Sequence, residues 1–201
     1  MPVSINGNTG VITGLAVGGL PDGIVDTDML AANAVTAAKA TGVGFTPEVN
    51  AFRIHTSYTG DQDPLQNWEV QDQTWEGQLG STLITESSGI WTFAKTGWYR
   101  LDLSHYFYSP HGNAQDWNNM FCRINTNSGS GSYPYILYTE NFNPSDGTNY
   151  KKSTAATLFK VPNISTYRIK FTTEHNNQTT VNVANTIAMN TGFILTRFGD
   201  I

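Results

Sequence analysis

The fold is decided by residues 98–108, which read Trp98-Tyr99-Arg100-Leu101-Asp102-Leu103-Ser104-His105-Tyr106-Phe107-Tyr108. Hydrophobic and polar side chains alternate along this stretch with a period of two, as in a β-strand with one buried face. One face then carries Tyr99, Leu101, Leu103, His105 and Phe107, and the opposite face carries Arg100, Asp102 and Ser104. The same alternation recurs at 166–172, where the inward face would carry Tyr167, Ile169 and Phe171 and the outward face Arg168 and Lys170. These two stretches predict strands.

Shorter alternating stretches surround these two strands. They lie at 52–58, 83–86, 90–93, 120–125, 135–139, 155–161, 178–183 and 192–198. Clusters of Gly, Pro, Asn, Asp and Ser separate them, and no helical pattern intervenes. Many short strands with turn signals at this spacing predict an all-β protein, a sandwich or jelly roll.

The aromatic residues divide the chain into two parts. Of 5 Trp, 9 Tyr and 10 Phe residues, only Phe45 precedes Phe52. We therefore predict an N-terminal arm at 1–45 and a head domain at 46–201. The arm is too poor in large side chains to offset its own ordering entropy, so it is either disordered or folded against another molecule. Its many Val, Ile and Leu residues favour order by association, as short extended pieces and single helical turns.

Composition excludes several classes of protein. The net charge is −5 and the basic residues are scattered, so nucleic acid is not expected as a partner. The N-terminus has neither a basic nor an apolar signal region, and no apolar run of membrane-spanning length follows, so we expect neither Sec export nor membrane insertion. Cys122 is the only cysteine, which rules out a disulfide within the chain and predicts a buried thiol.

Catalytic motifs are missing from the sequence. The histidines His55, His105, His111 and His175 are dispersed without metal-ligand spacing, and His105 lies on the apolar side of its strand, which predicts a hydrogen-bonded core residue. We expect no catalytic residues, no metal and no cofactor. A glycan-degrading tail protein is kept as an alternative, because paired carboxylates are often distant in the chain.

The segment Gly89-Ile90-Trp91-Thr92-Phe93-Ala94-Lys95-Thr96-Gly97-Trp98-Tyr99 resembles a signature of complement globular-head and tumour-necrosis-factor-like (TNF-like) jelly rolls. The end of the chain, Thr191-Gly192-Phe193-Ile194-Leu195, resembles their closing strand. The resemblance implies a TNF-like jelly roll that assembles as a homotrimer. It also leaves a secreted TNF-like receptor ligand as an alternative function.

The arm carries a second resemblance. Residues 12–39 are similar to the N-terminal segment of tailed-phage virion proteins, with the pattern GLPDG, V, D-x-L-A and AVT. This implies a bacteriophage structural protein, either a short fibre or knob of the tail or a capsid-decorating protein, that folds in the host cytoplasm and leaves by lysis. Its partners would be capsid or tail proteins. The residues implied in virion attachment are Leu20, Pro21, Asp22, Gly23, Val25, Asp26, Met29, Leu30 and Val35.

Six aromatic residues are candidate contacts. Trp98, Tyr106 and Tyr108 lie opposite the apolar face of their strand, so we expect them at the trimer interface, unless another part of the same chain covers them. Trp117, Tyr133 and Tyr135 lie among polar or small residues and are candidate contacts for host-surface glycan, because rings stack on sugars while amides bond hydroxyls. The alternative is that these three rings anchor their own loops.

Overall fold

The computed structural model describes residues 4–6, 11–13, 47–71, 78–112, 117–142, 147–176, 180–185 and 188–201. The chain divides into two units, Met1–Gly44 and Phe45–Ile201. In the first unit, β1 (Ser4–Asn6) pairs antiparallel with β2 (Val11–Thr13). The second unit contains the head.

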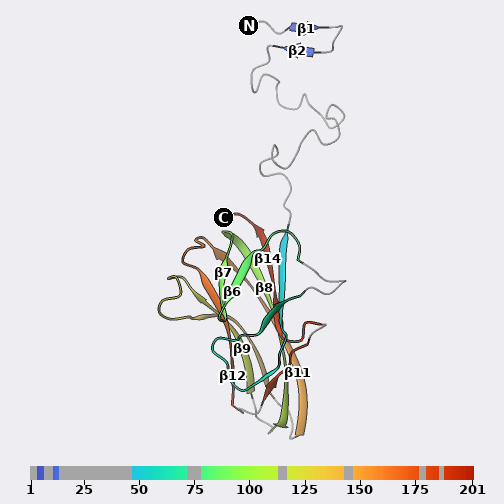
Figure 1. Cartoon of the computed structure of the whole chain (residues 1–201), viewed down its shortest axis with the longest axis vertical. Coiled ribbons are helices and arrows are strands. Elements are labelled where there is room, and N and C mark those ends of the chain that lie inside the picture. Colours follow the sequence, from blue (N-terminus) through green and yellow to red (C-terminus); the bar gives the residue numbers. More distant parts are fainter. Residues whose placement is uncertain are drawn as a thin grey trace. The chain divides into compact units, whose positions relative to one another are not determined.

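The head is a sandwich of two antiparallel sheets (Figure 1). The five-stranded sheet has the order β10-β9-β12-β7-β6, with strands Tyr135–Phe142, Trp117–Asn125, Arg168–His175, Ile90–Phe93 and Ile84–Ser87. The seven-stranded sheet has the order β4-β13-β8-β14-β3-β5, with strands Tyr58–Thr59, Val181–Asn182, Gly97–Gly112, Gly192–Gly199, Glu48–Ile54 and Trp68–Val70. Its remaining strand, β11 (Gly147–Val161), pairs with β8.

The chain crosses repeatedly between the sheets, from β7 to β8, from β8 to β9, from β10 to β11 and from β11 to β12. These crossings are those of a jelly roll and confirm the predicted all-β class. The predicted strand at 52–58 is wrong at both ends, because β3 spans Glu48–Ile54 and a separate strand, β4, begins at Tyr58. The short strand β5 was not predicted, since its three residues are too few to show a period.

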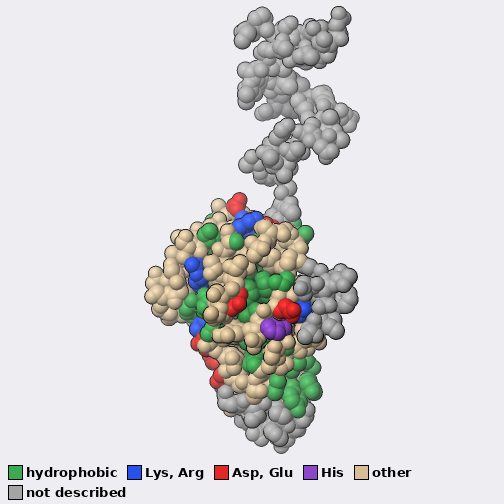
Figure 2. All heavy atoms as spheres, in the orientation of Figure 1, with side chains coloured by type: hydrophobic (Ala, Val, Ile, Leu, Met, Phe, Trp, Pro, Cys, Tyr) green, Lys and Arg blue, Asp and Glu red, His purple; other side chains and the backbone are tan. Residues whose placement is uncertain are grey.

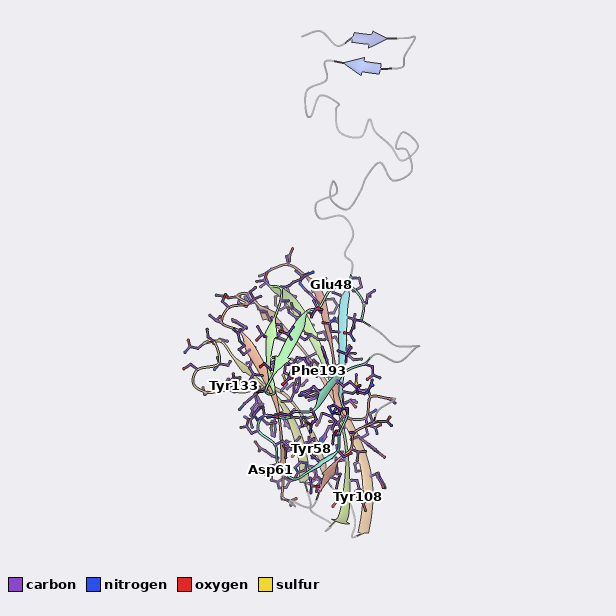
Figure 3. All side chains as sticks on the ribbon, in the orientation of Figure 1. Glu48, Tyr58, Asp61, Tyr108, Tyr133 and Phe193 are labelled. Carbon is purple, nitrogen blue, oxygen red and sulfur yellow. The ribbon has the colours of Figure 1, made fainter. Side chains whose placement is uncertain are left out.

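The core between the sheets is centred on Phe193 of β14, which is fully buried. Its ring packs on Phe52 and Trp68 of its own sheet, at centroid distances of 5.2 Å each. It also packs on Trp91 and Phe171 of the opposite sheet, at 5.0 and 4.5 Å. Figure 3 shows Phe193 in the middle of the head. Rings from both layers thus meet at one residue, and each buried ring contributes about 1.5–3 kcal/mol by leaving water.

Two glycines of the TNF-like signature have specific structural roles. Ser88 and Gly89 join β6 to β7 with φ values of 52° and 80°, as in a type I′ turn. A Cβ on Gly89 would lie 2.6 Å from Cγ of Pro64. Gly97 begins β8 with φ of 147°, and a Cβ there would lie 2.3 Å from the carbonyl oxygen of Gly199. The signature therefore records a tight turn and a close approach of two strands.

We expect Gly89→Ala to lower the free energy of unfolding by about 1–3 kcal/mol more than Gly131→Ala does, because only the first substitution adds an overpacked atom. The two glycines are matched in φ, at 80° and 83°, and no atom lies within 4 Å of a Cβ on Gly131. Urea unfolding of both variants measures the difference. Equal losses would show that the contact with Pro64 contributes nothing.

Candidate interaction surfaces

The outward face of β8 carries the three residues expected at a subunit interface. Trp98, Tyr106 and Tyr108 point away from the core, opposite the fully buried Tyr99 and Phe107. Trp98 is 47% exposed, whereas Tyr106 and Tyr108 are half-buried. Almost half of the Trp98 side chain thus remains exposed, so this face of the seven-stranded sheet presents aromatic surface to solvent.

Neighbouring strands extend this face with residues that sequence reasoning missed. Tyr150 of β11 stacks on Tyr106 and Tyr108, with ring centroids 6.0 and 4.7 Å apart. At the other end of β8, Trp98 lines a shallow hollow with Leu158 of β11 and Phe198 of β14. The alternation along β11 was a usable signal, because Tyr150 and Leu158 share one phase. The sequence does not show the pairing register between β11 and β8. In the structure this register places Tyr150 opposite Tyr108 and Leu158 opposite Arg100.

The middle of the same face is polar but internally paired. The Arg100 guanidinium donates to both carboxylate oxygens of Asp102, at 2.6 to 3.0 Å. Lys152 Nζ donates to the carbonyl oxygen of Met189 at 3.0 Å. The face thus has two apolar ends and a middle whose charges already have partners. Such a surface can be covered by another protein surface with little loss of hydrogen bonds to water.

The candidate glycan contacts lie on the other sheet and do not form one site. Trp117 begins β9, and its backbone exchanges hydrogen bonds with Asn176. Tyr135 begins β10 and is 56% exposed, whereas the half-buried Tyr133 lies just before that strand. Trp117 pairs with Phe142, seven residues along β10 from Tyr135, which is roughly 23 Å at about 3.3 Å per residue. Of these three residues, Tyr133 alone lies on a loop. Tyr133 and Tyr135 are close to each other, whereas Trp117 is distant from both.

A bulge at the start of β10 adds a residue that the sequence did not indicate. The register with β9 shifts between Tyr135 and Leu137. Because the shift breaks the period of two, Tyr135 and Tyr138 lie on the same outward face, with their rings 5.7 Å apart. Strict alternation would have put them on opposite faces. Figure 3 shows Tyr133 and Tyr108 on opposite sides of the head.

A hollow of about 380 Å³ opens where the two sheets part, between the edge strands β5 and β6. Its floor consists of Phe52, Trp68, Ile84 and Trp91, which belong to the aromatic core or pack against it. Figure 2 shows hydrophobic side chains at the centre of the visible face of the head. The hollow marks the open edge of the sandwich.

The predicted virion-attachment residues lie outside the described residues. They are Leu20, Pro21, Asp22, Gly23, Val25, Asp26, Met29, Leu30 and Val35. The helical turns expected in the arm lie outside them as well.

Two predictions about single buried residues are confirmed. Cys122 is fully buried, and burial raises the pKa of its thiol. His105 is a hydrogen-bonded core residue, since its Nε2 donates to Asn182 Oδ1 at 2.6 Å and its Nδ1 lies 3.4 Å from the hydroxyl of Thr139. That the protein is not an enzyme stays a prediction.

His105 belongs to a polar zone at one end of the core. Its ring centroid lies 6.2 Å from that of His175, whose backbone N–H and Nδ1 contact Asp61 Oδ1 at 2.7 and 3.2 Å. Figure 3 shows Asp61 and Tyr58 in the lower half of the head. Burial lowers the pKa of His105 to about 4, against the opposing effect of its hydrogen bond with Asn182. Burial also lowers the pKa of His175, which Asp61 partly offsets.

No group of three or more His, Cys, Asp or Glu side chains within the described ranges is arranged to hold a metal ion. The described residues contain no helix that is long and apolar enough to cross a bilayer.

No protein-family model matches the chain, and no curated protein matches its sequence. Among solved structures, the crystal structure of murine APRIL at pH 5.0 is similar, with a TM-score of 0.52 and 13% identity over 75% of this chain and 98% of that chain. Murine APRIL at pH 8.5 gives a TM-score of 0.50 with 10% identity over the same shares. Eiger TNF from S. frugiperda gives 0.47 with 15% identity over 78% of this chain and 94% of that chain.

The likeness to murine APRIL, together with the strand order, confirms the TNF-like jelly roll that the sequence predicted. At this identity the likeness concerns the fold alone.

We expect the head to lose stability as the pH falls from about 6.5 to about 4. In this range the unfolded chain protonates His105 while the folded chain keeps it neutral, so acid favours unfolding, with a slope of at most about 1.4 kcal/mol per pH unit for this group. Above pH 6.5 both states are neutral and the full stability is present.

The check is urea unfolding at several pH values and fixed protein concentration, comparing the chain with His105→Gln. The variant should show the shallower slope. An equal slope in both proteins would mean that His105 does not contribute to the acid sensitivity.

Proposed function

We propose that this chain is a non-enzymatic structural protein of a bacteriophage, a trimeric short fibre, knob or capsid-decorating protein. Residues 1–45 attach it to the virion, and residues 46–201 form the trimeric head. The protein folds in the host cytoplasm and becomes part of the virion. The head is presented to the host surface, where it contacts glycan.

The observation that carries the trimeric head is the outward face of the seven-stranded sheet. Trp98, Tyr150, Leu158 and Phe198 are 42–62% exposed on it. Exposed apolar side chains on neighbouring strands of one sheet are typical of a surface that is buried on assembly. Covering each Tyr or Trp contributes roughly 1.5–3 kcal/mol. The TNF-like fold supports this proposal, because the sequence resemblance implies a homotrimer.

The proposal of a virion role rests on the arm. Residues 12–39 resemble the N-terminal segments of tailed-phage virion proteins, and the arm has a single aromatic residue, Phe45, which is too few for a core of its own. A segment of this kind gains order by binding to a larger assembly.

A receptor ligand of the TNF type is a second candidate, favoured by the fold that the head shares with murine APRIL. Both candidates require the same assembled head. They differ in the role of the arm, because a receptor ligand needs no attachment to a particle.

The trimer is tested by Leu158→Lys, which places a charge on the outward face without disturbing the core, since Leu158 is 62% exposed. We expect the unchanged protein to have three times the chain mass of 22.0 kDa in native mass spectrometry, and the variant to dissociate at micromolar concentration while keeping its β-sheet circular dichroism. Because the same contact occurs three times in a closed trimer, one substitution per chain weakens all three contacts.

Ile164→Lys is the matched control, because Ile164 is 37% exposed but lies in the turn before β12, whose Ser165 and Thr166 carbonyls accept hydrogen bonds from Ser128 in the loop after β9 of the other sheet. It should remain a trimer. A monomeric unchanged protein, or a trimer that survives Leu158→Lys, would contradict the proposed interface.

Deletion of residues 1–45 tests the attachment role. We expect the truncated protein to remain a folded trimer and to be missing from purified particles, whereas the full chain is incorporated. Quantitative mass spectrometry of the particles measures both. Incorporation of the truncated chain at the level of the full chain would refute the role of the arm.

A further inference from the structure

The five-stranded sheet carries a separate aromatic cluster on its outward face. It consists of Phe121 of β9 and of Tyr135 and Tyr138 of β10, and we call these three residues the aromatic platform. The proposed trimer face belongs to the other sheet and points the opposite way, because the two sheets enclose the core between them. The platform is therefore not the surface that the proposed trimer interface uses.

The rings of the platform are held in fixed positions. Phe121 is only 9% exposed, and Tyr138 stacks on it with centroids 5.7 Å apart and an interplanar angle of 25°. Tyr135 contacts Phe121 at 5.6 Å and stands at 77° to Tyr138. Yet Tyr135 and Tyr138 remain 56% and 44% exposed. Two rings anchored to strands by a buried third ring lose little entropy when a ligand stacks on them.

Polar groups border the platform, and their charges are balanced. The guanidinium carbon of Arg123 lies 4.8 Å from the centroid of Phe121, while its Nη2 pairs with Glu174 at 2.6 Å and its Nε donates to Thr172 at 2.9 Å. Lys170 lies opposite Arg123 on the next strand. Lys170 forms an ion pair with a different carboxylate, that of Asp63. Its Nζ also lies 4.8 Å from the ring centroid of Tyr133.

This balance decides the kind of ligand. Two cations directly opposite each other would attract phosphate, sulfate or carboxylate, but each one here is already neutralised by a partner carboxylate. An anionic ligand would have to displace Glu174 or Asp63. A neutral ligand that is rich in hydroxyl groups meets no such cost, because it can both donate to the carboxylates and accept from the guanidinium.

We propose that the aromatic platform, with Arg123 and Glu174 at its border, binds a neutral carbohydrate. The exposed rings of Tyr135 and Tyr138 stack on the apolar faces of the sugar, and the ion pair bonds its hydroxyl groups. This inference rests on the proposed contact of the head with host-surface glycan and names its place and its chemical class. Binding by a single head is weak, and several heads on one particle raise the avidity.

The test titrates the full-length protein with neutral tetrasaccharides of glucose, mannose and galactose and with tetragalacturonate as the anionic probe, using saturation-transfer difference NMR. At least one neutral tetrasaccharide should bind, and more tightly than tetragalacturonate. The double variant Tyr135→Ala/Tyr138→Ala should weaken that binding at least tenfold.

Phe142→Ala is the matched control, since Phe142 lies on the same strand and is 58% exposed but belongs to no ring contact of the platform. It should change the affinity less than twofold. Absence of binding by every neutral probe, preference for tetragalacturonate, or equal losses in the control and the double variant would each overturn the proposal.

The same samples separate this proposal from the proposed function. Native mass spectrometry reports the trimer independently of sugar binding, so a trimer that binds no sugar refutes the platform alone. A double variant that falls apart into single chains would place the platform in a subunit interface and would also overturn the proposal.

Discussion

The packing of Phe193 against rings from both sheets is the interaction on which the rest of the head depends. Phe52 and Trp68 contact it from its own sheet, and Trp91 and Phe171 from the opposite one. Once these rings face inward, the period of two in each strand fixes which residues face outward. Both candidate surfaces are therefore consequences of the core, since Trp98 and Tyr138 lie outside because their neighbours in sequence lie inside.

The two outward faces differ in their balance of apolar and polar groups. The seven-stranded sheet presents apolar ends around an internally paired middle, which suits contact with another protein surface. The five-stranded sheet presents two exposed tyrosines bordered by the ion pair of Arg123 and Glu174, which suits a ligand that both stacks and hydrogen-bonds. One sandwich can thus use one face for assembly and the other for recognition.

The core is uneven along its length. Around Phe193 it is aromatic, whereas around His105 it contains the hydrogen-bonded Asn182 and Thr139 and the neighbouring His175. Buried polar groups are costly unless they are satisfied, so this end of the sandwich gains less from burial than the aromatic end. The β-strands that enclose it include the shortest of the head, β4 and β13.

The sequence by itself determined the all-β class, most of the strands and the inward face of β8, because alternation along one strand is a local property that burial imposes residue by residue. The sequence also singled out Gly89 and Gly97. Gly89 lies in a tight turn, and Gly97 lies where two strands approach closely. Only the tertiary structure decided which strands are neighbours, and hence that Tyr150 stacks on Tyr108 and that a bulge turns Tyr135 and Tyr138 to the same side. Pairing register depends on contacts between residues far apart in the chain, and no local period encodes it.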